Sequence, residues 1–386
     1  MAQTKLAING GQPVRNVPFV RQICINEQYL PSVLDILRSG KWSGYRANKD
    51  QYLGGPEIKK LCHEWSEHFG VEYVIPVNSC TSGLMACLSV LEKNLIDVTP
   101  YSMSCSASLP YLVSDVVWND IDEDYFQMDD NDSGADVAVP VSLFGHPLTW
   151  KYNADIVIED SAQCVSKQIY KTDFRVHSLT EGKHITCGEG GVITTDNKEL
   201  ARMVQNVINH EESVAHDFGL TSSGIGLNLR LTEIQASLVR SQLSLLGKNI
   251  EIRQQNVSYL NDRLRQIPGI RPAKTYSEGI HSYYCAPFHY TRSDVPRDAF
   301  LAAVRAELHN VRLNAGYIKP LYRFPCFSDK QNKLRLPIVE RMWKDELFLL
   351  LDIAHPHTLE DMEDIANSFE KVADNVRELY WENIYK

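Results

Sequence analysis

Short apolar segments alternate with helical patterns through the first half of this chain, and the alternation restricts its possible folds. Residues 57–69 form an amphipathic helical pattern, residues 73–77 an apolar strand, and residues 84–91 a second, more apolar helix. Further strands are expected at residues 115–117, 137–140, 154–158 and 192–195. Strands that alternate with helices predict an α/β fold, with a mostly parallel sheet covered on both faces.

Two helical patterns mark the second half of the chain. One begins at Thr232 and runs through Leu264, with a break expected near Gly247. Thr232 is a good start signal because Gln235 follows three residues later, which is the spacing of a capping box. The other pattern covers residues 359–385 and is strongly amphipathic.

The length of 386 residues suits two domains rather than one core. We expect a large domain over residues 1–250, which includes an N-terminal arm at residues 1–20. A smaller α+β domain is expected over residues 251–386, where the patterns are shorter and more mixed. Apolar residues make up 44% and charged residues 23% of the chain, as in globular proteins.

Charge and cysteine usage exclude several classes of partner. The net charge of −10 disfavours nucleic acid and anionic membranes, because both would repel the chain. No apolar run approaches the roughly 20 residues of a membrane span, and the N-terminus lacks a signal-peptide pattern. The nine cysteines are scattered without metal-ligand spacing, which predicts reduced thiols in a cytoplasmic protein without a structural metal.

The stretch DIVIEDSAQ, residues 155–163, places Asp160 at the end of an apolar strand. Parallel sheets bind their ligands at this carboxyl edge. A carboxylate there could hold the nitrogen of a bound pyridine ring in its protonated form. Asp160 could equally cap the next helix, and this stretch alone does not separate the two interpretations.

Two further stretches carry polar residues beside strands. Lys183 lies in HSLTEGKHITCGEGG, where the glycines permit close approach and a lysine can act as an imine-forming nucleophile. A lysine near glycines is more often solvated. Thr81 and Ser82, in NSCTSG, could seat a phosphate at a helix start, although an ordinary helix cap is the simpler interpretation.

In this order the three stretches resemble the DegT/DnrJ/StrS family of sugar and cyclitol aminotransferases, which depend on pyridoxal 5'-phosphate (PLP). The likeness covers nearly the whole chain. It includes LAINGGQPVR, GGPEIKKLCHEWSEHFG, VSLFGHP, GLNLRLTEIQASLVRSQL, PLYRFPCF and LLLDIAHPHTLEDMEDI. The resemblance implies fold type I, the aspartate-aminotransferase-like fold, with a mostly parallel central sheet and a smaller C-terminal domain.

The resemblance also implies roles for residues that hold the cofactor. Lys183 matches the Schiff-base lysine, Asp160 the partner of the pyridine nitrogen, and Gln163 the residue that lies against the ring. Residues that match phosphate contacts are Thr81, Ser82, Ser178 and Asn228. The family's asparagine at this last position reaches the phosphate of the neighbouring subunit, which implies a homodimer with shared active sites.

Two cofactor-binding positions depart from the family pattern. Cys80 stands where the family usually has glycine, and Ser104 where it has an aromatic residue that stacks on the cofactor. Met103 or Tyr101 could take the place of that ring. The departures leave open a different PLP reaction, whereas the retained lysine argues against the family's histidine-containing dehydratases.

The resemblance places aromatic residues and one histidine in the segments of the substrate cleft. These candidate substrate residues are Trp42, His184, Tyr317 and Tyr322. Each could equally serve packing. The implied activity is transfer of an amino group from glutamate or glutamine to a nucleotide-linked keto sugar or a keto cyclitol, in natural-product or polysaccharide biosynthesis. The alternative is elimination, dehydration or cyclisation on the same scaffold.

Overall fold

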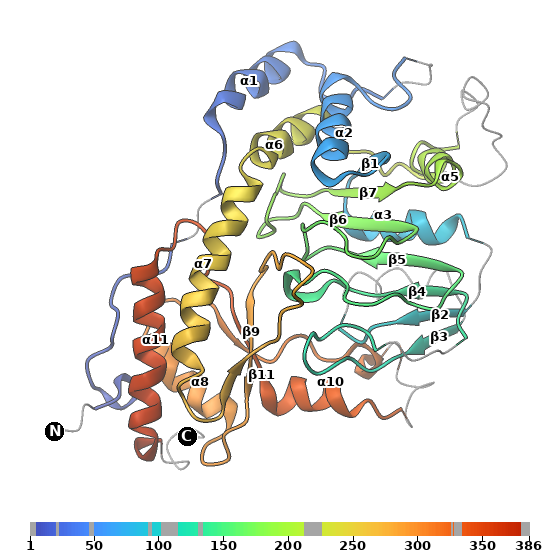
Figure 1. Ribbon diagram of the computed structural model, residues 1–386. Coiled ribbons are helices and arrows are strands. Elements are labelled where there is room, and N and C mark those ends of the chain that lie inside the picture. The colour runs from blue at the N-terminus through green and yellow to red at the C-terminus, as the bar shows by residue number, and fades with distance from the viewer. Residues whose placement is uncertain are drawn as a thin grey trace.

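The computed structural model describes residues 5–20, 23–45, 50–91, 95–101, 115–129, 134–211, 226–325, 327 and 334–379. A seven-stranded sheet with the order β1-β7-β6-β5-β4-β2-β3 occupies one part of the molecule (Figure 1). Its strands are β1 (Tyr73–Val77), β2 (Leu95–Val98), β3 (Asp115–Trp118), β4 (Val137–Val139), β5 (Ile156–Asp160), β6 (Phe174–Ser178) and β7 (Gly191–Thr195). Strand β7 runs antiparallel to both neighbours, and the other pairs are parallel. The mostly parallel sheet predicted from the sequence is confirmed.

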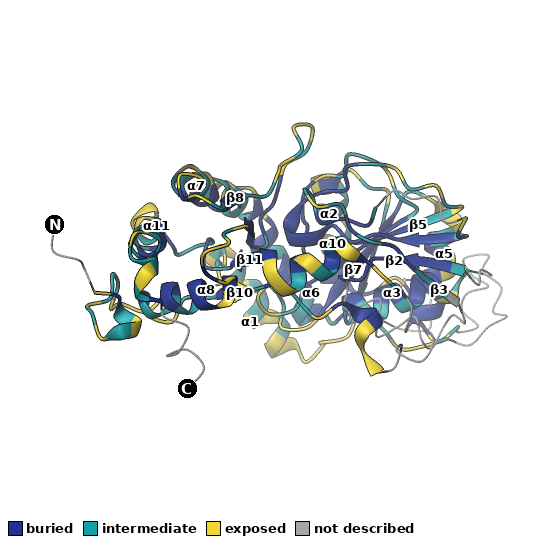
Figure 2. Ribbon diagram, turned by 90° about the horizontal axis from the view of Figure 1, so that it is seen from below, coloured by how far each residue is buried: buried dark blue, intermediate teal, exposed yellow. Residues whose placement is uncertain are grey.

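Helices cover both faces of this sheet. They are α2 (Pro56–Phe69), α3 (Cys80–Ser89), α5 (Lys198–Ile208) and α6 (Glu233–Leu243). Successive residues of β7 point to opposite faces, and Val192 accordingly packs with α2 and α6 whereas Ile193 packs with α3 and α5. The strands are buried, and exposed residues lie on outer helical faces (Figure 2).

A second sheet, with the order β10-β11-β9-β8, is antiparallel throughout. Its strands are β8 (Ile270–Pro272), β9 (Ala286–Tyr290), β10 (Leu313–Ala315) and β11 (Leu347–Leu350). The core of this part also includes Leu6 and Phe19 from the N-terminal segment. The domain limits themselves stay a prediction.

The long helix α7 (Leu246–Leu264) runs beside α11 (Leu359–Asp374) and continues the line of α6 (Figure 1). The remaining helices among the described residues are α1 (Leu30–Ser39), α8 (Arg297–Ala306), α10 (Pro337–Arg341) and the π-helix η6 (Met342–Glu346). Short 3-10 turns are η1 (Ala7–Asn9), η2 (Glu27–Tyr29), η3 (Leu143–Gly145), η5 (Leu321–Arg323) and η7 (Val376–Glu378). Within the described ranges, none of the helices combines the length and apolar character that a membrane crossing requires.

Several element boundaries differ from the sequence prediction. Strands β2 and β6 were not predicted, and β5 ends at Asp160 rather than at residue 158. Glu159 looks like the polar end of a strand, but its carboxylate is buried 3.1 Å from Nε of Arg175 on β6. The capping box of Thr232 and Gln235 is present, and the break between α6 and α7 comes just before Leu246.

Candidate active site

Asp160 lies at the carboxyl end of β5 and is buried. Its Oδ1 accepts a hydrogen bond of 3.0 Å from the backbone N–H of Ala162. The Sγ of Cys80, the first residue of α3, lies 3.9 Å from the same oxygen and 3.7 Å from the carbonyl oxygen of Val176. The carboxylate therefore sits where β5, β6 and the start of α3 meet.

Lys183 lies in the turn between β6 and β7, with Nζ 4.6 Å from the centroid of the Tyr284 ring. Burial lowers the pKa of the Lys183 amine, while Cys80, Asp160 and Cys285 act in the opposite sense. Coulomb interactions weaken with distance, so these groups share one neighbourhood. The structure thus brings together the lysine and the aspartate that the sequence singled out.

The N-terminus of α3 points to the same edge of the sheet. Ser79 caps the helix: its Oγ accepts the backbone N–H of Ser82 at 3.0 Å and lies 2.8 Å from the Ser82 hydroxyl. The helix begins four residues before the predicted start, so the capping residue is Ser79 and not Thr81 or Ser82. The signal was present, because a serine at the cap position precedes an apolar helix.

The backbone of β7 passes directly beside this helix start. A Cβ atom on Gly191 would lie 2.7 Å from the backbone nitrogen of Cys80. Ser178, at the end of β6, is buried, and its hydroxyl lies 3.4 Å from that of Thr180. Ser178 and the first turn of α3 flank the Gly191 end of β7, because Ser178 pairs with Gly191.

Gln163 has a fixed orientation. Its Oε1 accepts the backbone N–H of Phe144 at 2.8 Å, and its Nε2 donates to the Tyr317 hydroxyl at 2.7 Å. The Tyr317 ring stands edge-on to Tyr101 and Phe144, at centroid distances of 5.5 and 5.4 Å. Asp160 acts electrostatically on Tyr317, where burial raises the pKa of the phenol. Tyr317 therefore belongs to the Asp160 neighbourhood.

The other candidate substrate residues make different contacts. His184 is buried, and its Nε2 hydrogen-bonds to the carbonyl oxygen of Ser282 at 2.9 Å. The Trp42 side chain is 51% exposed and donates to the carbonyl of Leu37. Tyr322 is buried and donates to the Glu340 carboxylate. Their substrate roles stay predictions.

Two predicted cofactor residues remain. Asn228 is exposed, and its Oδ1 accepts a hydrogen bond of 3.0 Å from Nε of Arg230. The short segment around Asn228 pairs with Asn209, and Arg230 pairs with Val77 at the end of β1. Ser104 and its possible substitute Met103 lie outside the described residues.

A comparison with known protein families shows to which family the chain belongs. The model of the DegT/DnrJ/EryC1/StrS aminotransferase family matches residues 43–370. The chain belongs to this family. It is therefore a PLP-dependent aminotransferase of the sugar and cyclitol group.

Similar proteins cover most of the aminotransferase chain. L-glutamine:scyllo-inosose aminotransferase of Streptomyces griseus is 23% identical, over 97% of this chain and 99% of its own. UDP-4-amino-4,6-dideoxy-N-acetyl-beta-L-altrosamine transaminase of Campylobacter jejuni is 23% identical, over 78% and 86%. The structure of DesI in the presence of its TDP-sugar product has a TM-score of 0.83 at 20% identity and covers 98% of both chains, which shows the shared fold.

The described residues of this aminotransferase fit PLP. The first turn of α3 offers backbone N–H groups and the hydroxyls of Thr81 and Ser82, which suit a phosphate dianion. Asp160 is a buried carboxylate that can accept a hydrogen bond from a protonated ring nitrogen. Lys183 is a primary amine whose pKa is lowered by burial, as an imine-forming lysine requires.

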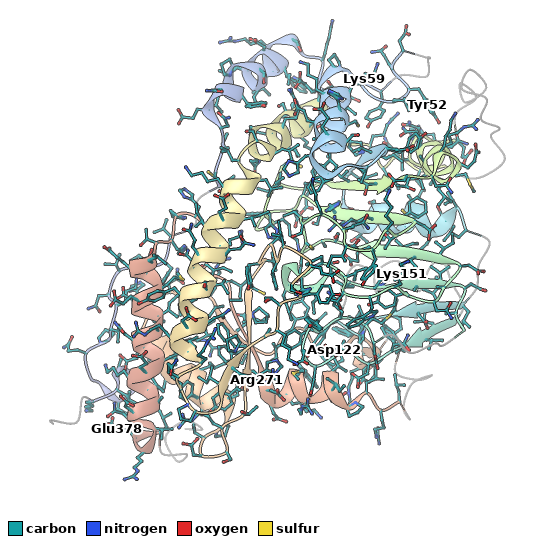
Figure 3. All side chains as sticks on the ribbon, in the orientation of Figure 1. Tyr52, Lys59, Asp122, Lys151, Arg271 and Glu378 are labelled. Atoms are coloured by element: carbon teal, nitrogen blue, oxygen red, sulfur yellow. The ribbon has the colours of Figure 1, made fainter. Side chains whose placement is uncertain are left out.

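A cavity of about 710 Å³ lies elsewhere in the enzyme, between α2, the edge strand β1 and α5. Lys59 on α2 and Tyr52 just before α2, two of its lining residues, lie at the far end of the molecule from Glu378 (Figure 3). None of the predicted site residues lines it. The chemistry of Asp160 and Lys183 is the better guide to the active site, because a hollow without those groups offers nothing for PLP.

Proposed function

We propose that this enzyme transfers an amino group from glutamate or glutamine to a keto sugar, carried on a nucleotide, or to a keto cyclitol. The observation that carries the proposal is the group formed by the half-buried Lys183 and the buried Asp160 near the start of α3. The named relatives act on a cyclitol ketone with glutamine and on a UDP-linked sugar, and they support both classes of acceptor. Such products enter natural-product or polysaccharide biosynthesis.

Lys183 and Asp160 have complementary roles in the proposed mechanism. Bound PLP withdraws electrons from the substrate carbon that loses its proton. Lys183 would hold the cofactor through its amine, and the free amine would remove and return that proton. Burial favours the neutral amine, which is the form that can accept a proton. The Asp160 carboxylate keeps the ring nitrogen protonated.

The remaining contacts form two groups, one for the phosphate of the cofactor and one for its ring. The start of α3, with Thr81 and Ser82, and the nearby Ser178 hydroxyl hold the phosphate. Gln163, whose amide is oriented by Phe144 and Tyr317, would contact the ring of the cofactor. Tyr317 then borders the space that the substrate enters.

The decisive experiment is a single half-reaction without acceptor. Each active site should release about one equivalent of keto acid when glutamate or glutamine is added. Borohydride reduction of the resting enzyme should leave the mass of the reduced cofactor on the peptide that contains Lys183. The Lys183→Ala variant should fold and show neither result.

Lys171→Ala is the matched control, because Lys171 lies on the surface and pairs with Asp196. It should behave as the parent enzyme does. Retained turnover in Lys183→Ala, or a tag on another lysine, would contradict the proposed site. Absence of keto acid with both donors, despite a tagged Lys183, would favour the alternative reactions of elimination, dehydration or cyclisation.

We infer further that the enzyme is a homodimer in which Asn228 of each chain reaches the phosphate in the neighbouring active site. Asn228 is exposed, as such a contact requires. Mixing Lys183→Ala and Asn228→Ala chains tests this inference. The test requires that Asn228→Ala alone lowers activity at least about 10-fold, which corresponds to a loss of roughly 1.4 kcal/mol. A mixed dimer with crossed contributions has one fully native site and regains activity. Activity no higher than that of Asn228→Ala would show that each site uses its own chain's asparagine.

A further inference from the structure

A segment of five residues, His281–Cys285, directly precedes β9 and is here named the strap. One side of the strap is bound to the turn around Gly145. Ser282 N–H donates to the Gly145 carbonyl at 2.8 Å, and Tyr284 N–H donates to the Phe144 carbonyl at 2.9 Å. A Cβ atom on Gly145 would lie 2.6 Å from the backbone nitrogens of Tyr283 and Tyr284, so the contact is as close as the two backbones permit.

Two buried side chains hold the strap at its carbonyl groups. His184 Nε2 binds the Ser282 carbonyl at 2.9 Å, and burial lowers the pKa of His184 well below the usual value, so the ring is neutral. Arg253 of α7 donates from Nη1 to the carbonyls of Tyr283 and Tyr284, at 2.6 and 3.4 Å. Buried hydrogen bonds from three separate segments therefore fix the position of Tyr284.

These hydrogen bonds determine where the face of the Tyr284 ring lies. The Tyr284 ring lies below the Lys183 amine, 4.6 Å from Nζ to the ring centroid. Cys80 on α3, Asp160 on β5 and Cys285 on the strap raise the pKa of this amine, and the amine in turn lowers the pKa of the neighbouring His184. The negative face of an aromatic ring attracts an ammonium group, and more strongly where water is excluded.

We propose that the Lys183 amine rests on the ring face of Tyr284 whenever that amine is not bonded to the cofactor. We call this position of the amine the seat. The ring face favours the protonated form of the amine, which the amine must adopt after removing a proton from the substrate. The proposal rests on the role proposed above for Lys183. Tyr284 is thereby a catalytic residue that touches the reacting amine, and His184 and Arg253 act on the amine through the strap.

The pKa of the Lys183 amine gives a test that does not depend on turnover. In the full chain freed of cofactor, the pH dependence of labelling by acetic anhydride, followed by peptide mass spectrometry, reports this pKa. Tyr284→Leu removes the ring and should lower the Lys183 pKa by about half to one unit. Tyr284→Phe keeps the ring and should restore the parent value. Lys171, which lies on the surface, is the internal standard and should not change.

Kinetics of the loaded enzyme give the second readout. With glutamate or glutamine in a single turnover, Tyr284→Leu should slow the half-reaction roughly 10-fold, while the KM for the donor stays within about 3-fold. Tyr284→Phe should remain within about 3-fold of the parent. A purely structural role would predict a loss in folding stability without a shift in the Lys183 pKa.

A graded series of ring substitutions at position 284 tests the proposal even if the leucine variant misfolds. Phenylalanine with one, two or three fluorine atoms at position 284 keeps the ring's shape and progressively weakens its negative face. The Lys183 pKa should fall with each fluorine. A flat series, with Lys183 still tagged by borohydride, overturns the proposed seat alone. A resting enzyme tagged at another lysine overturns the proposed function instead, so the two failures are distinguishable.

Discussion

Cys80 illustrates how one side chain changes the surroundings of a reactive group. Its thiol lies 3.9 Å from Oδ1 of Asp160 and 3.7 Å from the Val176 carbonyl, so it points toward the sheet. The hydroxyls of Thr81 and Ser82 remain at the helix start for a phosphate. The departure from the family's glycine therefore places a thiol beside the carboxylate.

Asp160→Asn should reduce turnover by about 10²-fold or more while cofactor still binds. The amide has the shape of the carboxylate but no negative charge to keep the ring nitrogen protonated. Steady-state kcat, together with the absorbance of bound cofactor, checks this expectation. Asp196→Asn, on the surface beside Lys171, is the control, and near-normal kcat in Asp160→Asn would remove that residue from the mechanism.

At the scale of elements, the important contact is between the start of α3 and the first residue of β7. Gly191 lies so close to Ser79 and Cys80 that a side chain has no room, because the obstructing atoms belong to the backbone. The first turn of α3 can therefore keep its N–H groups at the carboxyl edge only while position 191 lacks a Cβ. The helix position and the proposed phosphate seat depend on one glycine.

Gly191→Ala should weaken PLP binding by at least about 10-fold, because the added methyl group displaces the helix start and its charge-binding geometry. Fluorescence titration of the cofactor-free chain with PLP measures the change. Gly247→Ala is the matched control, since no atom would lie within 4 Å of the added Cβ and alanine is the better helix former. Unchanged PLP affinity in Gly191→Ala would show that the phosphate-binding site does not lie at the start of α3.

The molecule as a whole buries several neutral histidines. Burial lowers the pKa of His146 to about 4 and those of His177, His184 and His281 well below the usual value. These rings take up protons near pH 6.5 in the unfolded chain but resist protonation in the folded chain. Their contribution to the free energy of unfolding is complete above pH 6.5 and is lost as the pH falls.

The melting temperature should therefore be steady between pH 7 and 8 and fall steeply between about pH 6.5 and 4. With a folded pKa of about 4, His146 alone should account for roughly 3 kcal/mol across this range. Scanning calorimetry at several pH values measures the decline. His146→Gln should have a shallower decline, and the exposed His63→Gln should not. If the melting temperatures of the parent protein and of both variants fall in parallel below about pH 6.5, His146 does not titrate as expected.

Much of the chain's organisation could be predicted from the sequence, because it rests on neighbouring residues. The alternation of strands and helices and the capping box at Thr232 are local patterns, and the structure contains both. The motifs around Asp160 and Lys183 were identifiable for the same reason. The sequence determined the fold class, the family resemblance and the pair of residues at the centre of the proposed chemistry.

Tertiary structure alone decided which distant residues meet. Tyr284 lies far along the chain from Lys183, and Gln163 meets Tyr317 across 154 residues. No local pattern marks such contacts, since they follow from how the two sheets and the helices pack. His184 shows the same limit: its motif placed it beside Lys183, and only packing turned its ring toward the Ser282 carbonyl.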